Sequence, residues 1–262
     1  MDLRRLALAA GLACLSACSG RTSASSEAPV VAAAADLNLA LPEIATLFAA
    51  QGGDSVRLTF GSSGAFAQQI QNGAPFQVFL SADESYVDRL ASAGKTVDGG
   101  RLYAIGRIGL FLPKASSIAP DSLLQGLGDA LRHGGITRFA IANPEHAPYG
   151  RAAREALEHA QLWTLMNGKL VLGENAAQAT QFATSGSTEG GIIPLSLAKS
   201  PTVRDAGTFV LIPSAWHEPL RQRAVVLKGA GPVAQAFFAF LQTPEARAVF
   251  RRYGFVLPDE QP

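Results

Sequence analysis

Short apolar runs alternate with helix-like stretches along the chain from about residue 30 onward. The apolar runs are typical of buried strands, whereas the stretches between them contain good helix formers or carry Pro in the first turn. Strands are predicted at Val30–Ala35, Ser55–Phe60, Val78–Leu80, Ile105–Leu112, Phe139–Ala142, Lys169–Leu172, Gly191–Ile193, Thr208–Ile212 and Ala224–Leu227. Helices are predicted after the first strand to about Ala50, at Ala65–Asn72, from near Asp83, and at Tyr149–Ala160, Ala176–Ala183, Pro232–Leu241 and Pro244–Tyr253. This alternation predicts an α/β protein with mostly parallel sheets.

The first residues follow a different pattern. Arg4 and Arg5 precede the apolar run Leu6–Ala17, which is too short to span a bilayer and suits the hydrophobic region of a signal peptide. We therefore predict a signal peptide over residues 1–17 and an exported protein.

The end of that run, Leu15-Ser16-Ala17-Cys18, resembles the lipobox of bacterial lipoproteins, in which the cysteine becomes the acylated first residue. The resemblance implies a lipid anchor on Cys18, and the Ser-, Thr- and Ala-rich residues 18–29 are then a flexible tether. The alternative is an ordinary cleavable signal with an incidental cysteine.

Charge and cysteine content exclude several function classes. The 262 residues carry a net charge of +1, so no excess of Lys and Arg is present to bind nucleic acid. Removing residues 1–17, with their one acidic and two basic side chains, leaves 20 of each sign. Both cysteines, Cys14 and Cys18, lie in the N-terminal segment, which excludes a disulfide framework or a cysteine-ligated zinc site in the body of the protein.

Four predicted strand-to-helix joints consist mostly of small residues. The first turn of a helix has unpaired N–H groups and the positive end of the helix dipole, so each joint could hold an anion without Lys or Arg. Every α/β fold has such joints and most bind nothing, so one joint alone does not define a site. The four joints are Ala34-Ala35-Asp36, Gly61-Ser62-Ser63-Gly64, Ala147-Pro148-Tyr149-Gly150 and Glu174-Asn175-Ala176.

The Gly61-Ser62-Ser63-Gly64 joint fits two kinds of chemistry besides a simple turn with an N-cap serine. Its hydroxyls could cradle an oxyanion. It also approaches the nucleophile elbow of hydrolases, and Ser63 with His217 would follow the chain order of that class. A hydrolase needs a histidine base, and the four histidines show no motif of their own.

Motifs for nucleotides, paired-histidine metal sites and dinucleotides are absent, so no cofactor is predicted. His146 beside Glu145 and His217 beside Glu218 are each adjacent in sequence, and adjacent side chains seldom face one ion. Surface or loop positions are therefore expected for both pairs.

Taken together, the joints and their neighbours resemble the periplasmic molybdate-binding proteins of bacterial ABC importers. The matching segments run in family order over nearly the whole mature chain. They are Ala33-Ala34-Ala35-Asp36-Leu37, Gly61-Ser62-Ser63-Gly64 through Gln69-Ile70, Gly73-Ala74-Pro75-Phe76, Ser81-Ala82-Asp83-Glu84, Tyr103-Ala104-Ile105-Gly106, Asn143-Pro144-Glu145-His146-Ala147-Pro148-Tyr149-Gly150, Leu172-Gly173-Glu174-Asn175 and Tyr253-Gly254-Phe255.

The resemblance implies a two-lobed type II periplasmic-binding-protein fold. Each lobe would be a mostly parallel sheet flanked by helices, with the ligand in the cleft between the lobes. Lobe 1 is expected over residues 27–107 plus 221–262, and lobe 2 over residues 108–220. Such a protein is a binding protein and not an enzyme.

Carried over by position, the oxyanion contacts fall at Ala35, Asp36, Ser63, Tyr149 and Ala176, the joints described above. Ser63 is expected to donate its backbone N–H and its hydroxyl, and Tyr149 and Ala176 their backbone N–H groups. In this interpretation Asp36, Ser63, Tyr149 and Ala176 hold the molybdate, and Ser62 assists from the same loop.

Two positions depart from the family pattern. Asp36 stands where many members have a hydroxyl or amide side chain, and its carboxylate would repel a dianion. We therefore expect that side chain to cap its own helix and leave only its N–H for the ligand. Pro194 stands where a subset of the family has a tyrosine hydroxyl donor, and the Tyr149 hydroxyl is a candidate replacement.

Molybdate or tungstate is the ligand that the resemblance implies, with sulfate or phosphate as alternatives. Sulfate also needs only donors, whereas hydrogen phosphate needs an acceptor, which Asp36 could supply. The implied partners are an ABC permease and its ATPase, reached by a monomer anchored to the membrane through Cys18.

Overall fold

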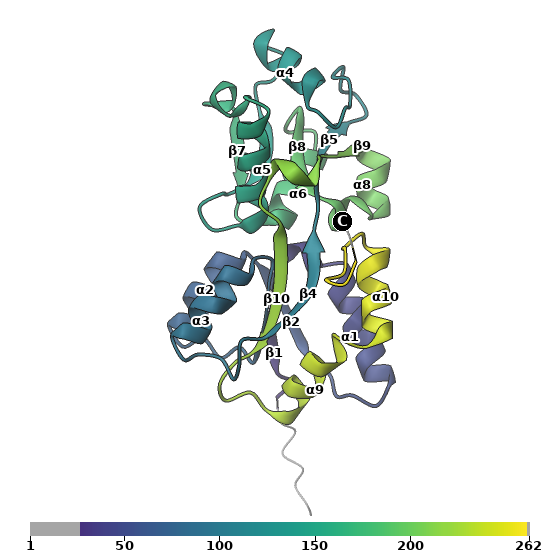
Figure 1. Cartoon of the computed structure of the whole chain (residues 1–262). Coiled ribbons are helices and arrows are strands. Elements are labelled where there is room, and N and C mark those ends of the chain that lie inside the picture. The colour runs from purple at the N-terminus through teal and green to yellow at the C-terminus, as the bar shows by residue number, and fades with distance from the viewer. Residues whose placement is uncertain (1–26, 261–262) are drawn as a thin grey trace, which may run out of the picture.

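The computed structural model describes residues 27–260, which form two lobes stacked along the long axis of the molecule (Figure 1). Each lobe is built on one five-stranded sheet. The predicted signal peptide, Cys18 and most of the predicted tether lie outside the described residues. Within residues 27–260, no helix has the length and apolar character needed to cross a bilayer.

The sheet of the first lobe has the strand order β2-β1-β3-β10-β4. Both neighbours of β1 are parallel to it, whereas β10 is antiparallel to β3 and to β4. One strand of the five is therefore reversed, in keeping with the predicted mostly parallel sheet. The strands are β1 (Val30–Ala34), β2 (Arg57–Gly61), β3 (Val78–Ser81), β4 (Arg101–Gly106) and β10 (Leu220–Val226).

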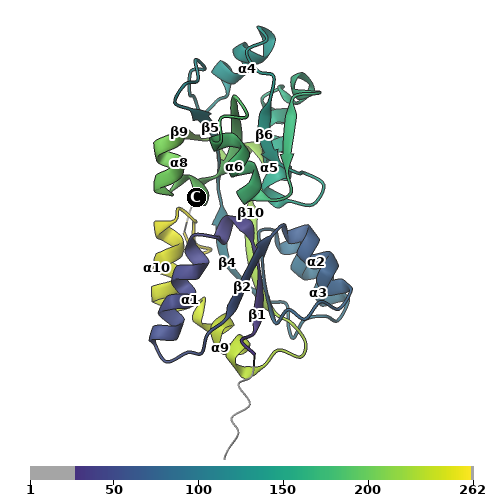
Figure 2. The ribbon, with the colours of Figure 1, turned by 180° about the vertical axis from the view of Figure 1, so that it is seen from behind.

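Alternate residues of these strands enter separate cores on the two faces of the sheet. In β1, Val31 and Ala33 pack with α1 (Ala40–Ala50), α9 (Pro232–Phe240) and α10 (Pro244–Arg252), whereas Ala32 packs against the opposite layer. That layer consists of α2 (Ser63–Gln71) and α3 (Glu84–Ser92), as Figures 1 and 2 show. Burial on both faces explains why β1 is apolar throughout and does not alternate with polar residues.

The second lobe repeats this plan with the strand order β7-β6-β8-β5-β9, in which β5 is the reversed strand. The strands are β5 (Ile108–Pro113), β6 (Phe139–Ala142), β7 (Leu170–Gly173), β8 (Gly190–Pro194) and β9 (Gly207–Leu211). The helices are α4 (Gln125–Arg132), α5 (Pro148–His159), α6 (Ala176–Thr184), α7 (Leu195–Ala198) and α8 (Pro201–Ala206). Short 3-10 turns lie at η1 (Ala35–Leu37), η2 (Trp163–Met166) and η3 (Ser214–Trp216).

The chain passes between the lobes at two places, and one of them corrects a sequence prediction. The single strand expected over Ile105–Leu112 is two strands, β4 and β5, which separate at Arg107 and belong to different sheets. Ala104 is buried in the core of the first lobe and Ile108 in that of the second. The apolar pattern therefore continues while the chain changes lobes. The return passage lies between β9 and β10.

The other predicted strands and helices are present, most of them with ends shifted by one to three residues. The strand at Phe139–Ala142 has the predicted bounds. The sequence did not predict α4, which contains Gly126 and Gly128, two poor helix formers. Its burial of Leu127 and Leu131 against the second lobe offsets that weak propensity.

Candidate functional site

The four predicted joints meet around one small cavity between the lobes. Two joints come from each lobe, because the loops that follow parallel strands gather at the same edge of a sheet. All six residues predicted to contact a ligand lie in its wall. The lining is Ala34, Ala35, Asp36, Gly61, Ser62, Ser63, Ala82, Ala147, Pro148, Tyr149 and Ala176.

Ser63 presents two donors at this cavity. It is the first residue of α2, where a backbone N–H has no carbonyl partner within the helix. Its side chain is buried, and Oγ accepts a hydrogen bond from the Ala82 N–H at 3.0 Å. This bond occupies a lone pair of Oγ and leaves the hydroxyl proton for a ligand.

Ser62 has a different role from its neighbour. As the N-cap of α2, its Oγ accepts the Ala65 N–H at 3.2 Å. The same Oγ lies 2.8 Å from the carbonyl oxygen of His146 and 2.9 Å from Nδ1 of that residue, on the opposite lobe. The Ser62 hydroxyl therefore donates its proton to a hydrogen bond with His146 of the other lobe, and this proton is not available to a ligand.

A backbone contact reinforces this connection. The Gly64 N–H donates to the His146 carbonyl at 3.0 Å, across the gap between the lobes. A Cβ atom at Gly64 would lie only 2.6 Å from that carbonyl oxygen, so the close approach requires glycine. Ser62, Gly64 and His146 thus form an interlobe seal beside the cavity.

The second lobe contributes the starts of two helices. Pro148 is the first residue of α5 and Tyr149 the next, so the Tyr149 N–H lies in the first turn. In α6, the Asn175 side chain caps the N–H groups of Ala177 and Gln178 at 3.0 and 3.1 Å. That cap does not use the N–H of Ala176, the first residue of the helix. Both N–H groups lack a carbonyl partner within their helix.

The Asp36 side chain does not adopt the predicted orientation. Its Oδ2 accepts hydrogen bonds from the Tyr149 hydroxyl at 2.8 Å and Gln222 Nε2 at 2.7 Å. The prediction was wrong because η1 is only three residues long, whereas two side-chain donors from α5 and β10 reach the carboxylate. The Tyr149 hydroxyl gives its proton to Asp36, so the suggestion that it replaces the donor lost at Pro194 is also wrong.

Burial governs the electrostatics of this group. Asp36 is 0% exposed, and desolvation raises the pKa of its carboxyl to about 6 from 3.8, although the bonds from Gln222 and Tyr149 act in the opposite direction. The same burial, together with the Asp36 charge, raises the pKa of Tyr149 and of Tyr103 well above the usual value. Both tyrosines are therefore neutral donors.

Sequence reasoning missed Gln222 and its role. Gln222 accepts the Tyr103 hydroxyl at 2.7 Å and donates to Asp36, which links β4, β10 and η1. Its sequence signal is a polar residue on the otherwise apolar face of β10, where Leu220 and Ala224 are buried beside it. Ser196, also missed, donates to the Asp36 carbonyl at 2.8 Å.

The histidine expected for a hydrolase lies elsewhere. His217 Nδ1 lies 2.8 Å from the carbonyl oxygen of Glu218, and His217 is not in the cavity wall. In the described part of the chain, no hydrogen bond joins it to Ser63. Burial lowers the pKa of His217, so the ring is neutral at physiological pH.

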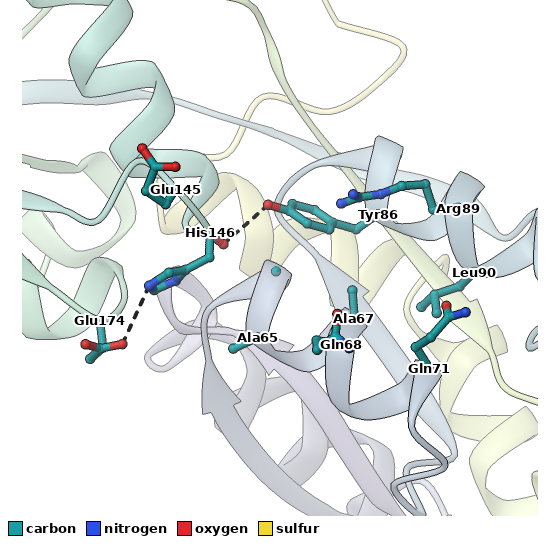
Figure 3. A pocket seen from close by; sticks show the side chains of 11 residues that line it. Ala65, Ala67, Gln68, Gln71, Tyr86, Arg89, Leu90, Glu145, His146 and Glu174 are labelled. Carbon is teal, nitrogen blue, oxygen red and sulfur yellow. Dashed lines mark hydrogen bonds and ion pairs between the residues drawn. The ribbon is translucent and has the colours of Figure 1, made fainter.

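A larger, open hollow borders the seal at Gly64 and His146 (Figure 3). α2 and α3 form one wall, and Glu145, His146 and Glu174 of the second lobe form the other. The Tyr86 hydroxyl is 3.4 Å from the His146 carbonyl, and His146 Nε2 is 3.6 Å from Glu174 Oε2. Over residues 27–260, no group of three or more His, Cys, Asp or Glu side chains could hold a metal ion.

The small cavity has the chemistry of an anion site. Within the described residues its wall contains no Lys, Arg or His, and its free donors are first-turn N–H groups and the Ser63 hydroxyl. Two α/β lobes that meet on such a cavity define the class of two-lobed solute-binding proteins. The chain belongs to the family of bacterial extracellular solute-binding proteins, which it matches over residues 29–256. It is an extracytoplasmic binding protein and not an enzyme.

Individual relatives agree with this assignment. The chain is 38% identical to the molybdate-binding protein ModA of Azotobacter vinelandii over 87% of this chain and 89% of that protein. It is 31% identical to ModA of Escherichia coli K12 over 98% and 100% of the two chains. The solved structure of the Azotobacter vinelandii periplasmic molybdate-binding protein superposes with a TM-score of 0.80, at 31% identity, covering 88% of this chain and all of that one.

Proposed function

We propose that this protein binds a tetrahedral oxyanion, molybdate or the similar tungstate, and delivers it to an ABC importer. The observation that carries the proposal is the buried cavity with several free N–H and O–H donors and no cationic side chain in its wall. Similarity to the molybdate-binding proteins of Azotobacter vinelandii and Escherichia coli supports molybdate as the ligand. A fully ionised dianion needs donors, and the first-turn N–H groups and the Ser63 hydroxyl are donors.

In this proposal the anion is held by Ser63, through its N–H and hydroxyl, and by the N–H groups of Tyr149 and Ala176. Ala35 and Asp36 contribute backbone from the first joint. Each hydrogen bond to a charged acceptor contributes about 1.5–3 kcal/mol, so four or five of them suffice for tight binding without an ion pair. The Ser62 hydroxyl is engaged in the seal, so Ser62 contributes by closing the site.

Sulfate and phosphate are the alternative ligands. Sulfate has the same shape and needs only donors, so cavity size separates it from molybdate. Hydrogen phosphate carries a proton and needs an acceptor, and the Asp36 carboxylate is the acidic group in the wall.

The remaining parts of the proposal concern export and assembly. Residues 1–17 are the signal peptide, Cys18 carries the lipid and residues 18–29 are the tether of a monomer that meets a permease and its ATPase. A 27% identical relative in Bacillus subtilis, covering 77% of this chain, is described as a putative ABC transporter substrate-binding lipoprotein, which supports the anchor. The proposed lobe bounds are 27–107 plus 221–262 for the first lobe and 108–220 for the second, and β10 of the first sheet begins at Leu220.

A ligand panel tests the proposal. Thermal unfolding is measured with molybdate, tungstate, sulfate and phosphate, because a ligand at 100 times its Kd stabilises the folded state by about 2.7 kcal/mol. We expect stabilisation by molybdate and tungstate at micromolar concentration. Stabilisation by sulfate or phosphate alone would show that this anion, and not molybdate, is the ligand. If none of the four anions stabilised the protein, oxyanion binding would be refuted.

A further inference from the structure

The Asp36 carboxyl group combines three features that bear on anion binding. It is fully buried, it belongs to the wall of the cavity, and its two oxygens differ in their contacts. Oδ2 accepts two hydrogen bonds, from Tyr149 and Gln222. Oδ1 is buried and has no hydrogen-bond partner among residues 27–260.

These contacts decide where a proton would bind. Both groups on Oδ2 are donors, since Tyr149 is a neutral phenol and Gln222 offers its amide nitrogen. A proton on Oδ2 would face these donors, whereas Oδ1 is free to bind it. The protonated carboxyl would keep both existing bonds and gain one new O–H donor.

The neighbouring elements offer no other way to neutralise the charge. Tyr149 of α5, Gln222 of β10 and Tyr103 of β4 are neutral, and α6 and α7 contain no ionisable residue. Among residues 27–260, no cation of the adjacent elements forms an ion pair with Asp36. Arg101 of β4 lies over the Phe238 ring, and Nε of Arg107, between β4 and β5, is buried without a hydrogen-bond partner. Other cations are paired with carboxylates of their own. These pairs are Arg57 with Glu27, Arg151 with Asp83 and Glu155, Arg154 with Glu158, and Arg221 and Arg223 with Glu84. His159 of α5 stacks on Trp216.

An ionised Asp36 and a dianion in one buried cavity would repel each other, because charges interact more strongly there than in water. We propose that anion binding takes up one proton from solvent, which binds Oδ1 of Asp36 and makes the carboxyl a neutral donor to the ligand. Asp36 is then a specificity-determining residue that favours fully ionised dianions. The inference rests on the proposed function.

Burial alone already brings the pKa of Asp36 close to neutrality in the ligand-free protein. The proton is therefore available at modest cost near pH 6 and increasingly costly above it. If only the protonated form binds, the Kd for molybdate rises about tenfold for each pH unit above about 6. Between pH 6 and pH 8 the affinity thus falls about 50-fold.

Calorimetric titration of the mature protein with sodium molybdate tests the inference. Titrations at pH 7.5 in buffers of different ionisation enthalpy give the protons taken up, and the expected value is about one per molybdate. Titrations from pH 6 to 8.5 give the slope of Kd. This measurement on the unaltered protein does not depend on any variant folding.

Asp36→Asn supplies the matched comparison, because an amide keeps an acceptor for Tyr149 and Gln222, offers an N–H donor and cannot ionise. We expect its Kd to change less than about threefold over the same pH range and its proton uptake to vanish. Asp129→Asn makes the same chemical change at an exposed side chain of α4 and should behave as the unaltered protein.

The outcomes separate the two proposals. Molybdate binding without proton uptake in the unaltered protein would overturn the inference and leave the proposed function standing. Uptake that persists in Asp36→Asn would assign the proton to another group and would also overturn it. Absence of molybdate binding at every pH would overturn the proposed function and the inference with it.

Discussion

Replacing Ser63 by alanine tests the oxyanion site most directly. The change deletes one buried hydroxyl that donates toward the cavity and accepts the Ala82 N–H at 3.0 Å. The backbone N–H of residue 63 and the cap by Ser62 remain. The variant therefore removes one ligand donor from the site without removing the start of α2.

Two magnitudes follow from these contacts. A hydrogen bond to a charged ligand contributes about 1.5–3 kcal/mol, so the Kd for molybdate should rise about 10- to 150-fold. The Ala82 N–H is left buried and unpaired, which destabilises the ligand-free fold by about 1–3 kcal/mol. Both losses arise from the same oxygen atom.

Isothermal titration with molybdate measures the first loss and urea unfolding of the ligand-free protein measures the second. Ser85→Ala on α3, where the side chain is exposed, is the matched control and should change neither value. A Ser63→Ala protein that binds molybdate within twofold of the unaltered protein would refute the role assigned to this hydroxyl.

The remaining predictions concern closure of the lobes and pH. Gly64→Ala places a Cβ 2.6 Å from the His146 carbonyl oxygen. We therefore expect the variant to bind molybdate more weakly in calorimetry, while the unfolding midpoint of the ligand-free protein stays unchanged. Unchanged affinity would show that the seal tolerates a methyl group. Asp83→Asn breaks the 3.0 Å interlobe ion pair with Arg151. Because both side chains are partly exposed, losing the pair should cost about 0–1 kcal/mol, and the Kd for molybdate should change less than about fivefold. A larger change in Kd would refute this reasoning. The raised pKa of Asp36 means that the folded state binds the proton more tightly than the unfolded state, so this group's contribution to stability is present below pH 3.8 and is lost as pH rises through about 6. The full loss amounts to about 3 kcal/mol. The free energy of unfolding of Asp36→Asn in urea should therefore rise by about 2.4 kcal/mol relative to that of the unaltered protein between pH 4 and pH 7, whereas a constant difference would refute it.

The sequence was most informative about the wall of the site. Each joint pairs an apolar strand with a helix start, and these are local signals that short segments carry by themselves. The meeting of Ser63, Tyr149 and Ala176 then follows from topology, because the carboxyl ends of parallel strands share an edge. The resemblance supplied the division into two lobes, with the joints of both lobes facing one cleft.

What the sequence by itself determined is therefore most of the strands and helices and the backbone donors at their joints, because these depend on neighbours along the chain. Only the tertiary structure decided the state of Asp36, since its partners Tyr149 and Gln222 are 113 and 186 residues away. It also decided that Ser62 closes the lobes through His146, 84 residues distant. A side chain with several available partners takes those that burial and the packing of both lobes bring within hydrogen-bond distance, and no local pattern contains that choice.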